Sequence, residues 1–144
     1  MGITRPRLRF PKLALILSCL ALFAALGGST YAATSSGGSS IHFTKATLKN
    51  GWTNSGGVYA PAGYAKDSLG VVHLRGGIHG GATNQTAFVL PSRLRPKHLL
   101  YVPVSTANYT EGTVGISYTG AVYPIGSDVG SFTSLGGISF VAGE

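Results

Sequence analysis

The sequence predicts an all-β domain, either a small antiparallel β-barrel or a β-sandwich of about eight short strands. Short apolar runs rich in valine, threonine and tyrosine alternate with turn residues along most of the chain. Glycine accounts for 22 of the 144 residues and charged residues for only 10%, a composition that disfavours helices. No window shows a sustained 3.6-residue apolar period. These observations together argue against helices and for many short strands.

The N-terminal segment is organised like a secretory signal peptide. A basic stretch without acids is followed by an apolar run, Leu13–Leu26, and then by small residues. Thr30 and Ala32 would occupy the −3 and −1 positions if cleavage falls before Ala33. The apolar run is shorter than the roughly 20 residues of a membrane-spanning helix. We therefore expect a cleaved signal peptide and a secreted protein, with an uncleaved membrane anchor as the alternative.

Three segments follow from this pattern. Residues 1–32 form the expected signal peptide and residues 33–40, which contain "TSSGGSS", a flexible linker. Residues 41–144 form the expected β domain. The only cysteine, Cys19, lies in the leader, so a disulfide cannot stabilise the mature chain. Its stability must come from an apolar core or from association with other chains.

Strand candidates occur at regular spacing after the linker. The residues Asp67–Gly70 read as the turn of a hairpin, and prolines at 91, 96, 103 and 124 are expected at strand ends or in edge strands. The expected strands are Ile41–Leu48, Tyr64–Lys66, Val71–Ile78, Thr86–Leu90, Leu99–Val104, Thr113–Tyr118, Ala121–Ile125 and Gly137–Val141.

The stretch "GVVHLRGGIHGG" could be a glycine-rich ligand loop, a metal site or a strand that ends in a loop. It lacks the Lys-Ser or Lys-Thr of a phosphate-binding loop, and no helix follows. In one straight strand His73 and His79 would lie about 20 Å apart, too far to share a metal ion, although a bend at 76–77 would change this distance. The alternation places Val72, Leu74 and Ile78 on one face. We predict a half-buried strand, with no metal ligands and no cofactor.

Few residues could support catalysis. The acids are Asp67, Glu111, Asp128 and Glu144, and no Gly-x-Ser-x-Gly motif is present. The prediction is a non-catalytic protein, with a glycosidase that uses Glu111 and Asp128 as an alternative. Four of the 11 basic residues lie in the leader, which leaves seven against four acids, a formal charge of +3. This modest charge argues against nucleic-acid binding.

Aromatic residues in loops indicate binding chemistry instead. Sugars stack their apolar faces on aromatic rings while amides bond their hydroxyls. The candidate ligand-binding residues are therefore Asn50, Trp52, Asn54, Tyr59 and Tyr109. An equally weighted alternative places Trp52 in the core.

From Leu48 onward the chain resembles the C-terminal head domain of phage tail-fibre and lower-baseplate receptor-binding proteins. The resemblance covers about two thirds of the chain, and its motifs are specific through their order rather than individually. They are Asn50-Gly51-Trp52, Tyr64–Asp67, Gly70–Gly76, Phe88–Pro91 with Arg95-Pro96, and Leu135–Phe140. The resemblance implies a small antiparallel β-barrel or sandwich that works as a trimer and binds cell-surface saccharide. Phage fibres have a long shaft, whereas this chain has a leader and a polar linker.

The sequence thus predicts a secreted bacterial, non-catalytic module that recognises cell-surface or cell-wall saccharide as a homotrimer. It would contact membrane only through an uncleaved leader. A structural, self-associating surface protein without a small ligand is the alternative. In a trimer, His79 or His98 from each chain could meet on the three-fold axis and hold a metal or an anion.

Overall fold

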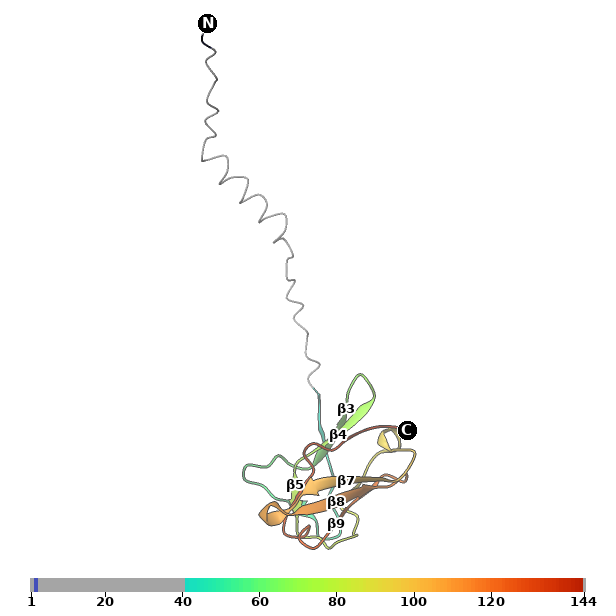
Figure 1. The fold of residues 1–144 in the computed structure, drawn as a ribbon. Helices are drawn as coiled ribbons and strands as arrows, with labels where there is room; N and C mark the ends of the chain where they lie inside the picture. The colour runs from blue at the N-terminus through green and yellow to red at the C-terminus, as the bar shows by residue number, and fades with distance from the viewer. Residues whose placement is uncertain (1, 3–40, 144) are drawn as a thin grey trace. The chain divides into compact units, whose positions relative to one another are not determined.

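The computed structural model describes Gly2 and residues 41–143. Within these residues all strands pair antiparallel and form three sheets (Figure 1). None of these sheets closes on itself, so the all-β prediction is confirmed and its sandwich form is favoured. The expected signal peptide, 1–32, and linker, 33–40, lie outside the described residues apart from Gly2. In the part of the chain described, no helix is sufficiently long and apolar to span a membrane.

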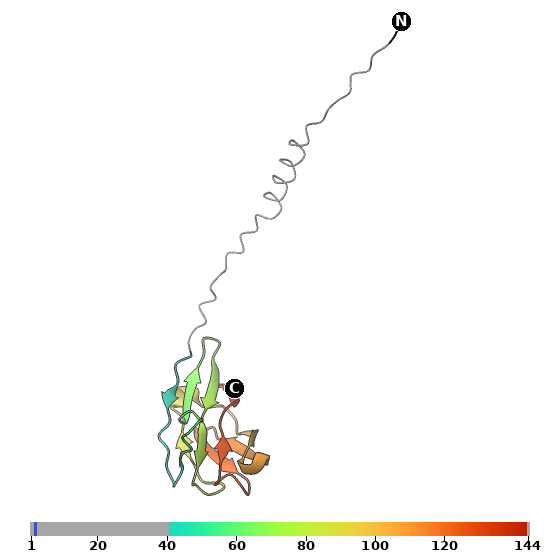
Figure 2. The same cartoon turned by 90° about the vertical axis from the view of Figure 1, so that its left-hand side faces the viewer.

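Sheet A has the order β1-β3-β4-β11, sheet B the order β10-β5-β2 and sheet C the order β6-β9-β8-β7. Figure 2 shows the β3–β4 hairpin projecting from the rest of the domain. The strands of sheet A are β1 (Thr44–Lys45), β3 (Gly63–Lys66), β4 (Val71–Arg75) and β11 (Ser139–Val141). Those of sheet B are β10 (Thr133–Ser134), β5 (Gly77–His79) and β2 (Thr53–Asn54). Those of sheet C are β6 (Phe88–Val89), β9 (Ala121–Ile125), β8 (Glu111–Ile116) and β7 (Leu100–Ser105). Two short 3₁₀ helices, η1 (Ser92–Leu94) and η2 (Ala107–Tyr109), precede and follow β7.

The strand expected over 71–78 is divided into two strands that belong to different sheets. The break lies at Gly76, whose φ is +105°. A Cβ atom at this position would lie 2.7 Å from both Ala60 O and Ala62 N. Only glycine fits this close approach and this backbone conformation. The chain therefore leaves sheet A after β4 and enters sheet B at β5.

The alternation predicted on either side of this break is confirmed. Val72, Leu74 and Ile78 are all buried, whereas His79 is exposed and His73 is half-buried. Val72, Leu74 and Ile78 belong to one apolar core that includes residues from every sheet. The largest fully buried side chains are Phe88, Ile78, Leu90, Ile116, Leu135 and Ile138.

The expected placement of prolines at strand ends or in edge strands is confirmed for Pro103 and Pro124. Pro103 lies in the edge strand β7, and Pro124 is the penultimate residue of β9, which runs between β6 and β8. The sheet tolerates it because β6 pairs with β9 only up to Val122. Beyond that point Asn84 N–H donates to Pro124 O at 2.8 Å. The nitrogen and carbonyl of a strand residue point to the same side, so the Pro124 nitrogen faces away from β8 and its missing N–H removes no hydrogen bond of the β8–β9 ladder.

Two short strands were not expected, and one expected strand is shorter. Both β2 and β10 have only two residues and pair with the two edges of β5. They lie in polar segments without the alternation that predicts a strand. The strand expected over 41–48 is reduced to β1, although Ala46 N–H still donates to Ala62 O at 2.8 Å just beyond the paired residues.

Candidate functional site

A hollow of about 570 Å³ lies where sheet B meets the end of β7. An isolated bridge between Thr106 and Thr133 joins the two sheets at this point. Both threonines are buried. The lining combines aromatic rings with hydroxyl and amide groups: Tyr59, Ser105, Thr106, Ala107, Asn108, Tyr109, Phe132 and Ser134.

The short helix η2 holds one side of this hollow. Asn108 and Tyr109 both have left-handed φ values, 58° and 60°, a conformation that costs energy in residues other than glycine. Thr106 Oγ1 donates to Thr110 O at 3.1 Å, and Thr110 Oγ1 donates to Asp128 Oδ2 at 3.2 Å. These bonds brace the tight turn from both ends. As a result the Tyr109 side chain is fully exposed, at 101%.

An aromatic pair also lines this hollow. The rings of Tyr59 and Phe132 lie 4.6 Å apart at an angle of 41°, a favourable tilted arrangement. Gly77 of β5 lies beneath them, where a Cβ would be 2.7 Å from Phe132 and 3.2 Å from Tyr59. Tyr59 remains 49% exposed. The absence of a side chain at Gly77 therefore allows the pair to rest on the strand and present an open ring.

Two of the predicted binding residues, Tyr59 and Tyr109, are thus brought together by the structure. The asparagines have structural partners elsewhere. Asn50 Nδ2 donates to Thr86 O at 2.8 Å, and Asn54 Oδ1 accepts from Ala62 N at 2.7 Å. Neither lines the hollow.

Trp52 has the core role rather than the stacking role. Its side chain is 2% exposed, and its indole Nε1–H donates to Gln85 O at 3.2 Å. The indole lies so close to Gly81 that a Cβ there would be 2.2 Å from two ring atoms. Because neither ring face is open to solvent, a sugar cannot stack on Trp52 in this structure.

Sequence reasoning missed Phe132 and Asn108. Phe132 lies in an irregular segment before β10, and its closeness to Tyr59 depends on the pairing of β10 with β5. Asn108 directly precedes Tyr109 in η2. The tendency of asparagine to adopt left-handed φ was the available signal.

The histidines of the glycine-rich stretch lie on different sheets. His79 Nε2 lies 3.2 Å from Thr53 Oγ1, whereas His73 contacts Asp67 and Ser139. Across the described residues, no three His, Cys, Asp or Glu side chains gather to hold a metal ion. Of the two acids of the glycosidase alternative, Glu111 is exposed at the start of β8 and Asp128 accepts the bond from Thr110.

The outer face of sheet C, defined here as Val89, Leu99, Tyr101, Pro103, Tyr123 and Ile125, is apolar and at least partly exposed. Tyr101 and Tyr123 both lie opposite Gly115 in the strand register. Partial burial, then the hydrogen bond with Tyr101, raises the pKa of the Tyr123 phenol. The two phenols therefore lie on either side of Gly115 on this face.

Comparisons with known proteins support the fold. No protein-family model matches the chain, and no curated protein matches it. Among solved structures, the chain is similar to the receptor binding protein (gp15) of Listeria phage PSA. The TM-score is 0.61 at 19% identity, over 96% of this chain and 83% of that chain. The expected likeness to a phage receptor-binding head is thereby confirmed at the level of the fold.

Proposed function

We propose that this chain is a secreted bacterial binding module that recognises cell-surface or cell-wall saccharide through the hollow between Tyr59 and Tyr109. The observation that carries the proposal is that an exposed Tyr109 and the Tyr59–Phe132 ring pair line the same hollow. The fold, which is similar to that of a phage receptor binding protein, supports a binding role.

The chemistry of the lining suits a sugar. Pyranose rings present C–H groups on one face and hydroxyls at the rim, so they bind best where aromatic rings and polar groups alternate. Here Ser105, Asn108 and Ser134 supply hydroxyl and amide groups beside the rings. The lining has no Lys, Arg, Asp or Glu, which favours a neutral glycan over a charged one.

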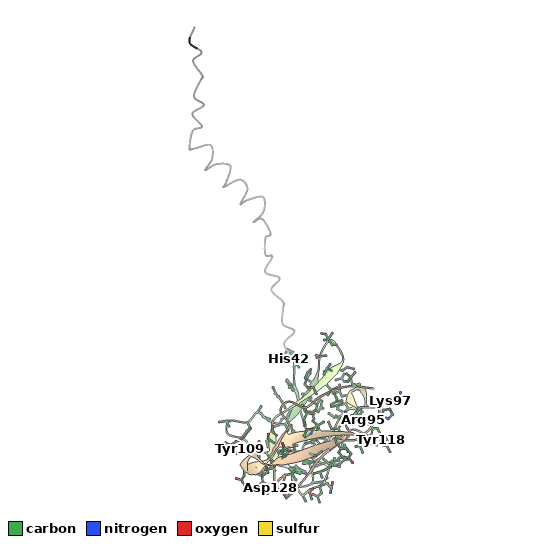
Figure 3. All side chains as sticks on the ribbon, viewed as in Figure 1. His42, Arg95, Lys97, Tyr109, Tyr118 and Asp128 are labelled. Atoms are coloured by element: carbon green, nitrogen blue, oxygen red, sulfur yellow. The ribbon has the colours of Figure 1, made fainter. Side chains whose placement is uncertain are left out.

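Binding to purified cell-wall polysaccharide tests this proposal. Figure 3 shows Tyr109 and Tyr118 at opposite ends of sheet C, and Tyr118 is 67% exposed outside the hollow. We expect Tyr109→Ala to weaken binding at least tenfold, about 1.4 kcal/mol. The matched control Tyr118→Ala should bind like the wild type. Equal effects of both variants, or saturable binding that neither changes, would contradict the assignment of the hollow.

We also propose that the module works as a homotrimer through the outer face of sheet C. An apolar sheet face without charged residues at its centre is typical of an interface between chains. Light scattering of the full chain in mild detergent should give about three chain masses. Tyr101→Lys should lower this mass to one chain, whereas Tyr118→Lys should not. A wild-type monomer would refute the trimer but leave the hollow as a single-chain site.

The leader proposal has a separate test. N-terminal sequencing of protein recovered from bacterial culture medium should begin at Ala33. Protein found only in the membrane fraction, with its leader intact, would support the anchored alternative instead.

A further inference from the structure

A serine, a histidine and an aspartate form a hydrogen-bonded chain on sheet A, away from the hollow. Ser139 of β11 lies opposite His73 of β4 in the strand register. Ser139 Oγ is 3.1 Å from His73 Nδ1, and His73 Nε2 is 2.9 Å from Asp67 Oδ2. Ser139 lies 66 positions after His73 in the sequence, and no short motif contains the three residues.

The partners of His73 fix its tautomer. A carboxylate only accepts hydrogen bonds, so Nε2 must carry the proton and donate it to Asp67. Nδ1 of the neutral ring is then a lone pair that accepts the Ser139 hydroxyl proton. This is the order of roles in a serine–histidine–aspartate triad, with the two ring nitrogens exchanged.

Asp67 is rigidly held in this arrangement. Its Oδ1 accepts from the backbone N–H groups of Leu69 and Val71, both at 2.9 Å, which closes the hairpin turn. Oδ2 is left for His73. The turn therefore holds the carboxylate in place independently of its bond with His73, as the third group of a catalytic triad is held.

The Ser139 side chain is accessible, and its backbone N–H points toward the open edge of sheet A. The side chain is exposed, and β11 is the edge strand of sheet A. Leu74 N–H bonds Ile138 O at 2.9 Å, so alternation points the Ser139 N–H away from β4, toward the open edge. A backbone N–H of the nucleophile itself is a common donor to the oxyanion of acyl transfer.

We propose that Ser139 is an activated nucleophile that cleaves small acyl esters, such as O-acetyl groups presented on a surface polymer. His73 takes the Ser139 proton on Nδ1 while Oγ forms a bond to the acyl carbon. The ester C–O bond then breaks, and the leaving alcohol takes the proton from Nδ1. Water releases the acid by the reverse sequence and regenerates Ser139.

The surroundings of Ser139 limit the size of the acyl group that the site accepts. Ser139 does not line the hollow at Tyr59 and Tyr109, nor the hollows beside Asp67 and beside Pro103, so none of these three offers a pocket for a long acyl chain. His73 and Ser139 are the catalytic residues of this proposal, and Asp67 is a positioning residue. The proposal does not rest on saccharide binding by the hollow.

Reaction of the full chain with a fluorophosphonate probe, read by mass spectrometry, tests the nucleophile. We expect labelling at Ser139, no labelling in Ser139→Ala, and at least about 100-fold slower labelling in His73→Gln. The exposed neighbour Ser68 gives the control, because Ser68→Ala should label like the wild type. Labelling of Ser68 and Ser139 at equal rates, or no labelling at Ser139, would overturn the proposal.

Two further measurements cover the case in which His73→Gln does not fold. Hydrolysis of p-nitrophenyl acetate should fall to background in Ser139→Ala, a change at an exposed position; an unchanged rate overturns the proposal. Nitrogen NMR of the His73 ring should show the proton on Nε2 in the wild type. It should show a mixture of tautomers in Asp67→Asn, which keeps the turn-closing oxygen. An unchanged tautomer would refute the positioning role of Asp67.

Discussion

Replacing Trp52 with alanine should separate stability from binding. The side chain is 2% exposed and packs directly on Gly81, so its removal leaves a large cavity. Truncation of a buried tryptophan costs about 3–5 kcal/mol, and the loss of the indole N–H leaves Gln85 O without its partner. For a domain of this size each kcal/mol lowers Tm by about 4–8 °C. We therefore expect Tm to fall by at least about 12 °C.

Urea unfolding followed by far-ultraviolet circular dichroism is the appropriate assay, because Trp52 is the only tryptophan and its fluorescence disappears with it. Tyr109→Ala, which removes a fully exposed side chain, should change the free energy of unfolding by less than about 0.5 kcal/mol. If Trp52→Ala is as stable as the wild type but no longer binds glycan, the stacking role is correct and the core argument is wrong. Trp52→Phe, a smaller cavity, provides the same comparison if the alanine variant does not fold.

Three further predictions concern the backbone and the titrating groups. Gly76→Ala should destabilise the protein by at least about 2 kcal/mol, because the new Cβ meets Ala60 O and Ala62 N at 2.7 Å. Gly137→Ala is the control, since Gly137 also has a positive φ but no atom lies within 4 Å of its Cβ position; it should destabilise the protein clearly less. Equal losses of stability in thermal unfolding would mean that the positive φ alone determines the effect. The hydrogen bond from His73 lowers the pKa of the Asp67 carboxyl, so its contribution to stability is present above the usual aspartate range and is lost as pH falls through the lowered pKa. Acid unfolding curves should therefore be less steep in Asp67→Asn, and parallel curves would refute this. Burial, followed by the interaction with Tyr101, raises the pKa of the Tyr123 phenol. The stability that the protonated phenol contributes is therefore present below the usual tyrosine pKa and is lost as pH rises through the raised pKa. Tyr101→Phe should shift the titration of Tyr123, followed by absorbance, to lower pH.

The fold class was predictable because strand periodicity survives in a single sequence. The expected strand Ala121–Ile125 has the same bounds in the structure, since alternating apolar residues between two turn signals leave little freedom. The break at Gly76 was not predictable in this way. Its cause is the close approach of Ala60 and Ala62, residues on a different segment, and no local pattern reports such a contact.

The candidate site was predictable only in part for the same reason. An exposed tyrosine and a buried tryptophan both read as aromatic residues in loops, so Tyr109 and Trp52 could not be separated before their burial was known. The network of Asp67, His73 and Ser139 is still harder to predict from the sequence. It depends on the register of β11 against β4, which brings together residues 66 positions apart.

The glycine-rich stretch connects the two proposed surfaces and explains why they are independent. Before Gly76, β4 presents His73 beside Ser139 on sheet A. After Gly76, β5 supports the Tyr59–Phe132 pair through Gly77 on sheet B. A change at Gly76 should therefore impair glycan binding and probe labelling together, because it displaces both strands. Tyr109→Ala should weaken glycan binding and leave probe labelling intact, whereas Ser139→Ala should abolish labelling and leave glycan binding intact. If either variant removed both activities, the two surfaces would be a single site, and the division of the strand at Gly76 would have no functional consequence.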